Sequence, residues 1–391
     1  MATLNRRNWI KSSALMAGGV TLLSGAANEL MATPAKKIHG SIEEAFTTDE
    51  AIILQHAPAA IKARLSANEN PFGPSPAAKR ALAEAVDMGY QYPFMKTQEL
   101  VGKIVAYEGI ERSNILMDSG STPLLLAAAI CYGKNGAEII TGDPSYADLP
   151  ASASKLGSKI VKVPLTADYK LDLDAMETKI GPNTGLVYIC NPNNPTATVV
   201  DTAKLKTFCE RVSKKVPVFI DEAYIDYLPD PQSVTLINSV KTGQNVIVAR
   251  TFSKLYGFAG LRCGYVVAQP DTIKALSKYA TGSMSLSATT VAAACAAYQE
   301  KDFLQDAWKK TMASKEYLYS VLKQEGYEYI PSSANFVLFP IKMDGMRFST
   351  EMANRGVSIR FWQFNNKDWC RVSIGRMDEM QTFAEAFKQL S

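Results

Sequence analysis

This sequence contains few histidines and no closely spaced cysteine pairs. Only two histidines occur in 391 residues, His39 and His56, and both precede the main body of the chain. The sequence therefore offers almost no histidine from which a metal site or a catalytic triad could be built. The six cysteines are scattered through apolar or mixed segments, with no short spacing of the metal-binding or redox kind. We expect them to be buried, unbridged thiols.

A strong net charge and a long apolar run are also lacking. The formal net charge is +4, which gives no reason to expect nucleic acid or anionic lipid as a partner. The apolar stretch at residues 14–23 is too short, and too interrupted by glycine, to span a membrane. With 47% hydrophobic residues, the chain is long enough for two domains with full cores.

The first part of the chain has the order of an export signal. Arg6 and Arg7 lie in a basic stretch, the apolar stretch follows, and small residues come after it. This order fits a twin-arginine signal peptide over residues 1–35, cut near Ala27 or Ala35. The alternative is a chance Arg-Arg pair before an amphipathic helix. We expect export of the folded protein to the periplasm, without stable membrane association after cleavage.

From about Pro76 to Pro270, the chain alternates helix-length segments with short β-branched or apolar runs. The runs are at residues 137–141, 159–163, 186–190, 216–220, 245–249 and 263–268. Strands separated by helices are typical of a mostly parallel sheet covered on both faces. We therefore predict an α/β fold, with a large domain over residues 78–284.

A different pattern follows Ser285. Two long helical patterns come first, then three strands and a closing helix; these helices and strands are expected at residues 288–299, 303–326, 335–339, 357–361 and 370–374. The pattern predicts a smaller α+β domain over residues 285–391. We expect the N-terminal segment 36–77 to be part of this smaller domain.

The strongest local signal is a lysine that follows the run at 245–249. The hydroxyls of Thr251 and Ser253 precede Lys254, and Arg262 follows it eight residues later. A lysine just past a buried strand end can hold an aldehyde cofactor, while hydroxyls and a guanidinium hold the cofactor's phosphate. A Ser-Lys pair by itself is more often a surface lysine after a strand.

A carboxylate ends the preceding run. Asp221 follows residues 216–220 directly, and Tyr224 lies three residues further on. A carboxylate at the C-terminal end of a parallel strand can keep a pyridine nitrogen protonated, and a nearby phenol can reach the 3-oxygen of that ring. Open α/β sheets bind ligands at this end of their strands. Taken alone, Asp221 could equally be a helix cap.

Three further segments offer ligand groups. Asn194 lies in a turn fixed by prolines, and its amide can donate to the same 3-oxygen. Gly120, Ser121 and Thr122 open an apolar helix, whose free backbone N–H groups are suited to an anion. Tyr146 follows a further strand and offers an aromatic ring to lie over a cofactor.

Taken jointly and in this order, these segments resemble the fold-type-I pyridoxal-phosphate (PLP) enzymes. The resemblance is closest to the histidinol-phosphate aminotransferase family, within the class I/II aminotransferases. It extends from Leu-Ser-Ala-Asn-Glu-Asn-Pro at 65–71 to Cys-Arg-Val-Ser-Ile-Gly at 370–375, nearly the whole chain after the leader. It implies PLP as the cofactor, and a large domain around a mostly parallel, seven-stranded sheet.

The resemblance also implies a role for each matched residue. Lys254 would carry PLP as a Schiff base and move the substrate proton, and Asp221 would pair with the pyridine nitrogen. Tyr224 and Asn194 would bond the 3-oxygen, Asn194 also facing the substrate, and Tyr146 would stack on the ring. The phosphate would be held by residues at the helix start, in the lysine segment and in the other subunit of a homodimer, namely Gly120, Ser121, Thr122, Thr251, Ser253, Arg262 and Tyr92.

At the substrate end, Arg371 matches the family's arginine for the acidic end of the substrate, and Arg360 matches a second arginine near it. Two positions depart from the family pattern: Ala197 replaces a glycine, and Arg376 replaces a small polar residue. The aromatic run at 361–364 is either core packing or one wall of the substrate pocket.

The leading interpretation is a dimeric aminotransferase that moves an amino group between an amino acid, or a related amine, and a 2-oxo acid. A PLP-dependent decarboxylase or lyase stays open, because a fold does not fix a reaction. An exported binding protein without catalysis is disfavoured, because Lys254 and Asp221 are both present. Histidinol phosphate belongs to a cytoplasmic pathway, so we do not expect an exported enzyme to serve it.

Overall fold

The computed structural model describes residues 60–391. The predicted export signal and both histidines lie outside the described residues. No helix within those residues is long and apolar enough to cross a membrane. The six cysteines are all free, and five of them are buried. The prediction of unbridged thiols is therefore confirmed, although Cys131 is only partly buried.

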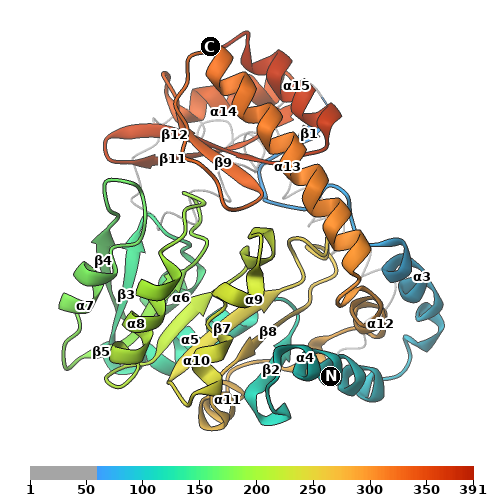
Figure 1. Cartoon of the computed structure of the whole chain (residues 1–391), viewed down its shortest axis with the longest axis vertical. Coiled ribbons are helices and arrows are strands. Elements are labelled where there is room, and N and C mark those ends of the chain that lie inside the picture. The colour runs from blue at the N-terminus through green and yellow to red at the C-terminus, as the bar shows by residue number, and fades with distance from the viewer. Residues whose placement is uncertain (1–59) are drawn as a thin grey trace, which may run out of the picture. The chain divides into compact units, whose positions relative to one another are not determined.

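A seven-stranded sheet lies at the centre of the larger part, in the strand order β2-β8-β7-β6-β5-β3-β4 (Figure 1). Its strands are β2 Ile115–Asp118, β3 Glu138–Asp143, β4 Lys159–Pro164, β5 Thr184–Cys190, β6 Val218–Asp221, β7 Val246–Thr251 and β8 Gly264–Val267. Strands β4, β3, β5, β6 and β7 pair in parallel, whereas β8 is antiparallel to both of its neighbours. The predicted α/β fold with a mostly parallel sheet is confirmed. Only β2 was not foreseen, since it is short and contains a single β-branched residue.

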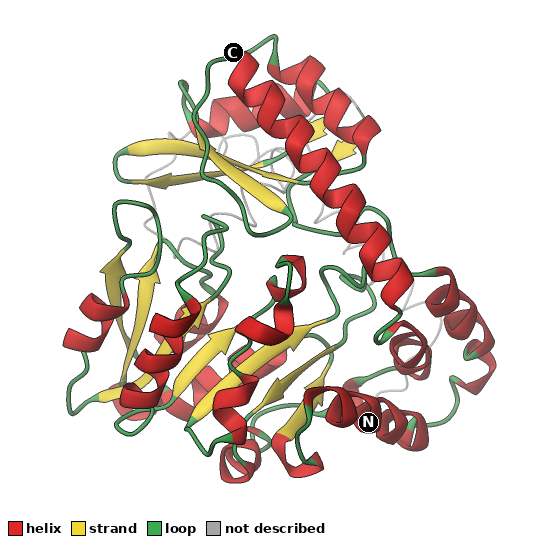
Figure 2. Cartoon of the chain, viewed as in Figure 1, coloured by secondary structure: helices red, strands yellow, loops and turns green. Residues whose placement is uncertain are grey.

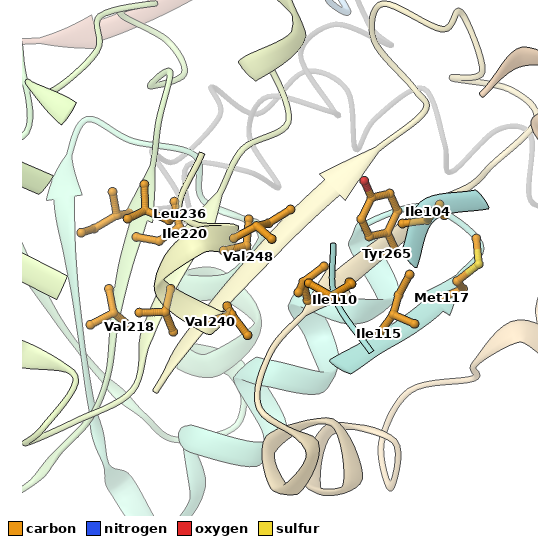
Figure 3. Close-up of a cluster of buried hydrophobic side chains, with 14 of the residues drawn as sticks. Ile104, Ile110, Ile115, Met117, Val218, Ile220, Leu236, Val240, Val248 and Tyr265 are labelled. Atoms are coloured by element: carbon orange, nitrogen blue, oxygen red, sulfur yellow. The ribbon is translucent and has the colours of Figure 1, made fainter. Parts of the chain in front are cut away.

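Helices cover both faces of this sheet (Figure 2). One apolar cluster joins one face to α4 Phe94–Glu108, α7 Leu173–Thr178, α8 Thr202–Val212, α10 Ile237–Lys241 and α12 Ala288–Ala297. A second cluster joins the other face to α5 Thr122–Tyr132, α6 Asp148–Lys155 and α11 Pro270–Leu276. Figure 3 shows part of the first cluster, where Val218, Ile220 and Val248 of the central strands gather with Leu236 and Val240. Because both faces are buried, the central strands are mainly apolar, and polar residues such as Asp221 and Thr251 lie at their carboxyl ends.

The smaller part is built on a three-stranded antiparallel sheet in the order β11-β12-β9. Its strands are β9 Phe336–Pro340, β11 Arg360–Phe364 and β12 Lys367–Ser373, and a short parallel pair adds β1 Ala63–Arg64 and β10 Val357–Ser358. Helices α13 Lys301–Gln324, α14 Gly345–Asn354 and α15 Met377–Phe387 pack on these strands. Before them, α12 packs against α3 Pro76–Glu84 and α4, so the core of the larger part continues to Tyr298.

The prediction of a single strand at 357–361 was wrong. The chain forms two strands there, which separate at Ile359, because β10 pairs with β1 and β11 pairs with β12. The two halves therefore belong to different sheets, although the apolar pattern runs through both.

Candidate active site

A cavity lies at the carboxyl ends of the central strands, where ligands bind in open α/β sheets. Asp221 ends β6 and Thr251 ends β7 at this edge. Arg360 and Arg371 of the small sheet line the opposite wall. The cavity brings together all the residues predicted for the site except Gly120, which lies beside it, and Tyr92, which lies outside it.

Lys254 lies in the segment after β7, with its Nζ 5.2 Å from the centroid of the Tyr224 ring. Burial, and then the positive charge of Arg371, lower the pKa of Lys254 to about 8. A larger fraction of this amine is therefore neutral near pH 7 than for an exposed lysine. A neutral amine is the form that attacks an aldehyde or accepts a proton.

Asp221 is 2% exposed, and both of its carboxylate oxygens accept a hydrogen bond. Oδ2 accepts from the Tyr188 hydroxyl at 3.0 Å, and Oδ1 accepts from the Ala223 N–H at 3.1 Å. Burial raises the pKa of Asp221 to about 6, against the effect of these two bonds. The helix-cap alternative does not hold, because Tyr224 occupies the N-cap position of the short helix that follows. A buried carboxylate of this kind favours a cationic partner.

A hydrogen-bond network connects the phenol of Tyr224 to Arg371 through Asn194. The Tyr224 oxygen accepts from Asn68 Nδ2 at 3.0 Å and, more weakly, from Asn194 Nδ2 at 3.5 Å. Arg371 Nη1 in turn donates to Asn194 Oδ1 at 2.7 Å. Since two amides donate to the Tyr224 oxygen, its own proton is available to a ligand in the cavity. Sequence reasoning missed Asn68, whose φ of 53° is a conformation that asparagine tolerates better than most residues.

Tyr146 lines the cavity from the segment before α6. Its hydroxyl donates to the Asp148 carboxylate, which fixes the direction of the ring. Glu69 and Cys190 also line the cavity and had no predicted role. Glu69 lies in the segment 65–71, which carries the family resemblance, and Cys190 ends the apolar run at 186–190.

The start of α5 forms one end of the cavity. Ser121 is the N-cap residue, and no side chain caps the first turn, so N–H groups at this helix start can bind an anion. Arg262 Nη1 donates to Ser253 Oγ at 3.3 Å, and Thr251 Oγ1 donates to the same oxygen at 3.0 Å. A Cβ at Gly120, where φ is 91°, would lie 2.3 Å from Arg262 Nη2. Only glycine therefore leaves room for the guanidinium beside the helix start.

These observations fit the cofactor that the sequence resemblance implies. Lys254 provides the amine, Asp221 the buried carboxylate, and the start of α5 with Arg262 a cradle for a phosphate. Within the described residues, no group of three His, Cys, Asp or Glu side chains is placed to hold a metal ion.

Two arginines from adjacent strands of the small sheet lie side by side in the cavity wall. Arg360 and Arg371 are direct partners in the β11–β12 ladder, and both line the cavity. Arg371 is buried, and its Nη2 donates to the Ser66 carbonyl at 2.6 Å, which fixes the guanidinium plane. Two adjacent guanidiniums favour the anionic end of a ligand.

The aromatic run beside Arg360 packs into the protein rather than lining the cavity. The ring of Phe361 lies against Gly345, where an added Cβ would come within 2.5 Å of it. Trp362 is 8% exposed, in a cluster with Leu338 and Trp369. The structure therefore supports core packing, rather than a pocket wall, for Phe361 and Trp362.

The two departures from the family pattern have simple structural settings. Ala197 adopts a φ of 58°, a left-handed conformation in which glycine is less strained. Arg376 lies at the surface, where it pairs with Asp378 and Glu379 at the start of α15. Neither side chain lines the cavity.

Residues 60–387 match the family model described as aminotransferase class I and II. A histidinol-phosphate aminotransferase of Moorella thermoacetica is 36% identical over 329 residues, which cover 84% of this chain and 85% of that protein. An aromatic amino acid aminotransferase of Mycolicibacterium vanbaalenii is 36% identical over 328 residues, covering 83% and 91%. A solved histidinol-phosphate aminotransferase of Sinorhizobium meliloti, in complex with pyridoxal-5'-phosphate, has a TM-score of 0.81 at 27% identity, covering 92% of this chain and 100% of that one.

Proposed function

Because the chain belongs to the aminotransferase class I and II family, we propose that its cavity is the active site of a PLP-dependent aminotransferase. The enzyme moves an amino group between an amino acid, or a related amine, and a 2-oxo acid. The observation that carries the assignment is one cavity that holds Lys254, Asp221 and the anion cradle of α5 together.

Each residue has one task in this mechanism. PLP, when bound, withdraws electrons from the α-carbon of the substrate amine. Lys254 Nζ takes up the proton that leaves this carbon, which its lowered pKa favours. The Asp221 carboxylate would pair with the protonated pyridine nitrogen of PLP, and the Tyr224 hydroxyl would donate a hydrogen bond to the 3-oxygen of the ring. Arg371 binds and orients the acidic end of the substrate.

The substrate proposal is an amino acid whose carboxylate pairs with Arg371. Arg371→Lys removes a planar, bidentate partner that a lysine cannot reproduce. A hydrogen bond between ionised groups contributes about 1.5 to 3 kcal/mol, so KM for the amino donor should rise roughly ten- to a hundredfold. The measurement is steady-state kinetics with 2-oxoglutarate as acceptor, after the absorbance of bound PLP has been checked to be nearly unchanged. An unaltered KM would place the carboxylate elsewhere.

Arg360→Ala is the matched comparison for that variant. A loss confined to acidic donors or acceptors, such as glutamate and 2-oxoglutarate, supports a second anion contact at Arg360. An equal loss for every donor would make this arginine structural. A measured preference for histidinol phosphate over every free amino acid would contradict the substrate proposal.

We further propose a homodimer in which Tyr92 reaches the phosphate cradle of the partner subunit. Tyr92 is 69% exposed and lies outside the cavity of its own chain. Tyr90, Phe94 and Met95 nearby are also exposed large apolar side chains, and such a patch favours a protein interface. Met95→Glu should convert the dimer to a monomer in light scattering and weaken PLP binding. A dimer of unchanged affinity would argue for another interface.

We propose that the enzyme works in the periplasm, after export by the twin-arginine route. Arg6 and Arg7, followed by a weakly apolar stretch, support this. Replacing both arginines by lysine should leave the full-length protein in the cytoplasm, as cell fractionation and immunoblotting would show. Mature-size protein that still reaches the periplasm would mean that another route is used.

A further inference from the structure

Tyr188 carries a polar group into an otherwise apolar layer. It lies in the middle of β5, is fully buried, and belongs to the apolar cluster on the α5 and α6 face of the sheet. Its ring packs against Phe219, with 5.9 Å between the ring centroids. A phenylalanine could fill the same space, so packing does not explain the hydroxyl.

The register of the sheet directs this hydroxyl to Asp221. Tyr188 pairs with Phe219, and Cys190 pairs with Asp221, so all four side chains lie on the same face. From there the Tyr188 hydroxyl donates to Asp221 Oδ2 at 3.0 Å. Ala223 N–H is the donor to the other oxygen. The carboxylate is thus held at both oxygens, and each oxygen keeps a lone pair for a further donor.

We propose that Tyr188 is a positioning residue, which keeps Asp221 ionised and aimed at the cofactor's pyridine nitrogen. The assignment to the pyridine nitrogen rests on the proposed function, whereas the effect on Asp221 does not. A neutral donor stabilises the carboxylate without cancelling its charge, which a lysine or arginine in the same place would do. Burial and the neighbouring Asp221 raise the pKa of the Tyr188 phenol well above its usual range, so it stays a donor at working pH.

Other titratable groups surround Asp221 and set the background for any pH measurement. They come from the strand ends, the α6 segment and the lysine segment, namely Cys190, Tyr146, Asp148, Tyr224 and Lys254. Within residues 60–391, the donors to the Asp221 carboxylate are the Tyr188 hydroxyl and the Ala223 N–H, which distinguishes Tyr188 from all five.

The test is Tyr188→Phe in the cofactor-free protein, with 13C-labelled aspartate and NMR titration of the Asp221 carboxyl, assigned with Asp221→Asn. Loss of a hydrogen bond to the charged form should raise the titration midpoint by about one pH unit. Tyr227→Phe is the matched control: it also removes a buried phenol oxygen, one with no hydrogen-bond partner within the described residues, and it should leave the midpoint in place. An unchanged midpoint in Tyr188→Phe, or an equal shift in both variants, overturns the proposal.

A second arm uses enzyme loaded with PLP that is 15N-labelled in the pyridine ring. In Tyr188→Phe the nitrogen signal should move toward its unprotonated position, and the Tyr227→Phe signal should match the wild type. If wild-type protein takes up no PLP, the proposed function fails while the first arm still decides the role of Tyr188. A normal nitrogen signal in Tyr188→Phe would overturn the step from Asp221 to the cofactor.

Discussion

Lys254→Ala should abolish both covalent attachment of PLP and transamination. Among residues 60–391, Lys254 is the lysine that lines the cavity, which the anion cradle at the start of α5 also lines. Without its amine, the described residues that line the cavity include no other lysine that could form an imine with the aldehyde carbon. The variant can still bind PLP through the phosphate contacts, so PLP uptake alone does not measure the loss of covalent attachment. Borohydride reduction followed by peptide mapping identifies the lysine that carries the cofactor.

A second buried lysine provides the internal control for this experiment. Burial also lowers the pKa of Lys315 to about 8, but its Nζ donates to the Ser332 carbonyl, outside the cavity. A lowered pKa alone would therefore allow labelling at either lysine, whereas cavity geometry allows it only at Lys254. Label on Lys315, or on any lysine except Lys254, would contradict the assignment.

The pH dependence of PLP capture should follow the same amine. Because the folded-state pKa of Lys254 is about 8, the neutral fraction grows with pH below that value and levels off above it. The attachment rate in the cofactor-free protein should therefore rise up to about pH 8 and then become constant. Stopped-flow absorbance at several pH values would show this.

Asp221→Asn should slow removal of the substrate α-proton by orders of magnitude while PLP binding weakens far less. The asparagine keeps the shape of the side chain and can still accept from Tyr188, but it carries no negative charge to hold a protonated ring nitrogen. Phosphate binding is distant from this change, so most of the affinity for PLP should remain. Single-turnover kinetics with an α-deuterated donor would isolate the proton step.

A structural role for Asp221 would give a different outcome. If Asp221 only held the turn that leads to Tyr224, the asparagine variant should keep a third or more of wild-type turnover and lose stability instead. A melting curve recorded beside the kinetics separates the two cases. If turnover survives at that level, Asp221 does not serve to keep the pyridine nitrogen protonated, and the assignment is wrong.

Most of the central sheet could be predicted because its strands are buried on both faces. Such strands appear as continuous apolar runs, and polar residues immediately after them mark the ligand edge. This is why Asp221 and Lys254 could be placed from local sequence. Strand β2 was missed because Ile115–Asp118 is short, and the break at Ile359 was missed because pairing partners are not visible in a single run.

The remaining site residues depend on contacts that no local pattern shows. Asn68 reaches Tyr224 across 156 positions of sequence, and Tyr188 reaches Asp221 only because β5 and β6 pair in one particular register. The aromatic run after Arg360 shows the same limit. Its composition suited a pocket wall and a core equally well, and only the neighbours Gly345 and Trp369 distinguish the two.

The most direct test of the account is the half-reaction of the wild-type enzyme with an amino acid alone. The PLP-loaded protein is mixed with a panel of amino acids, without any 2-oxo acid, while the cofactor absorbance and released carbon dioxide are followed. An aminotransferase should convert the cofactor to its amine form, release one equivalent of 2-oxo acid and release no carbon dioxide. Carbon dioxide release with the original absorbance restored would instead identify a decarboxylase on the same fold, and would contradict the account.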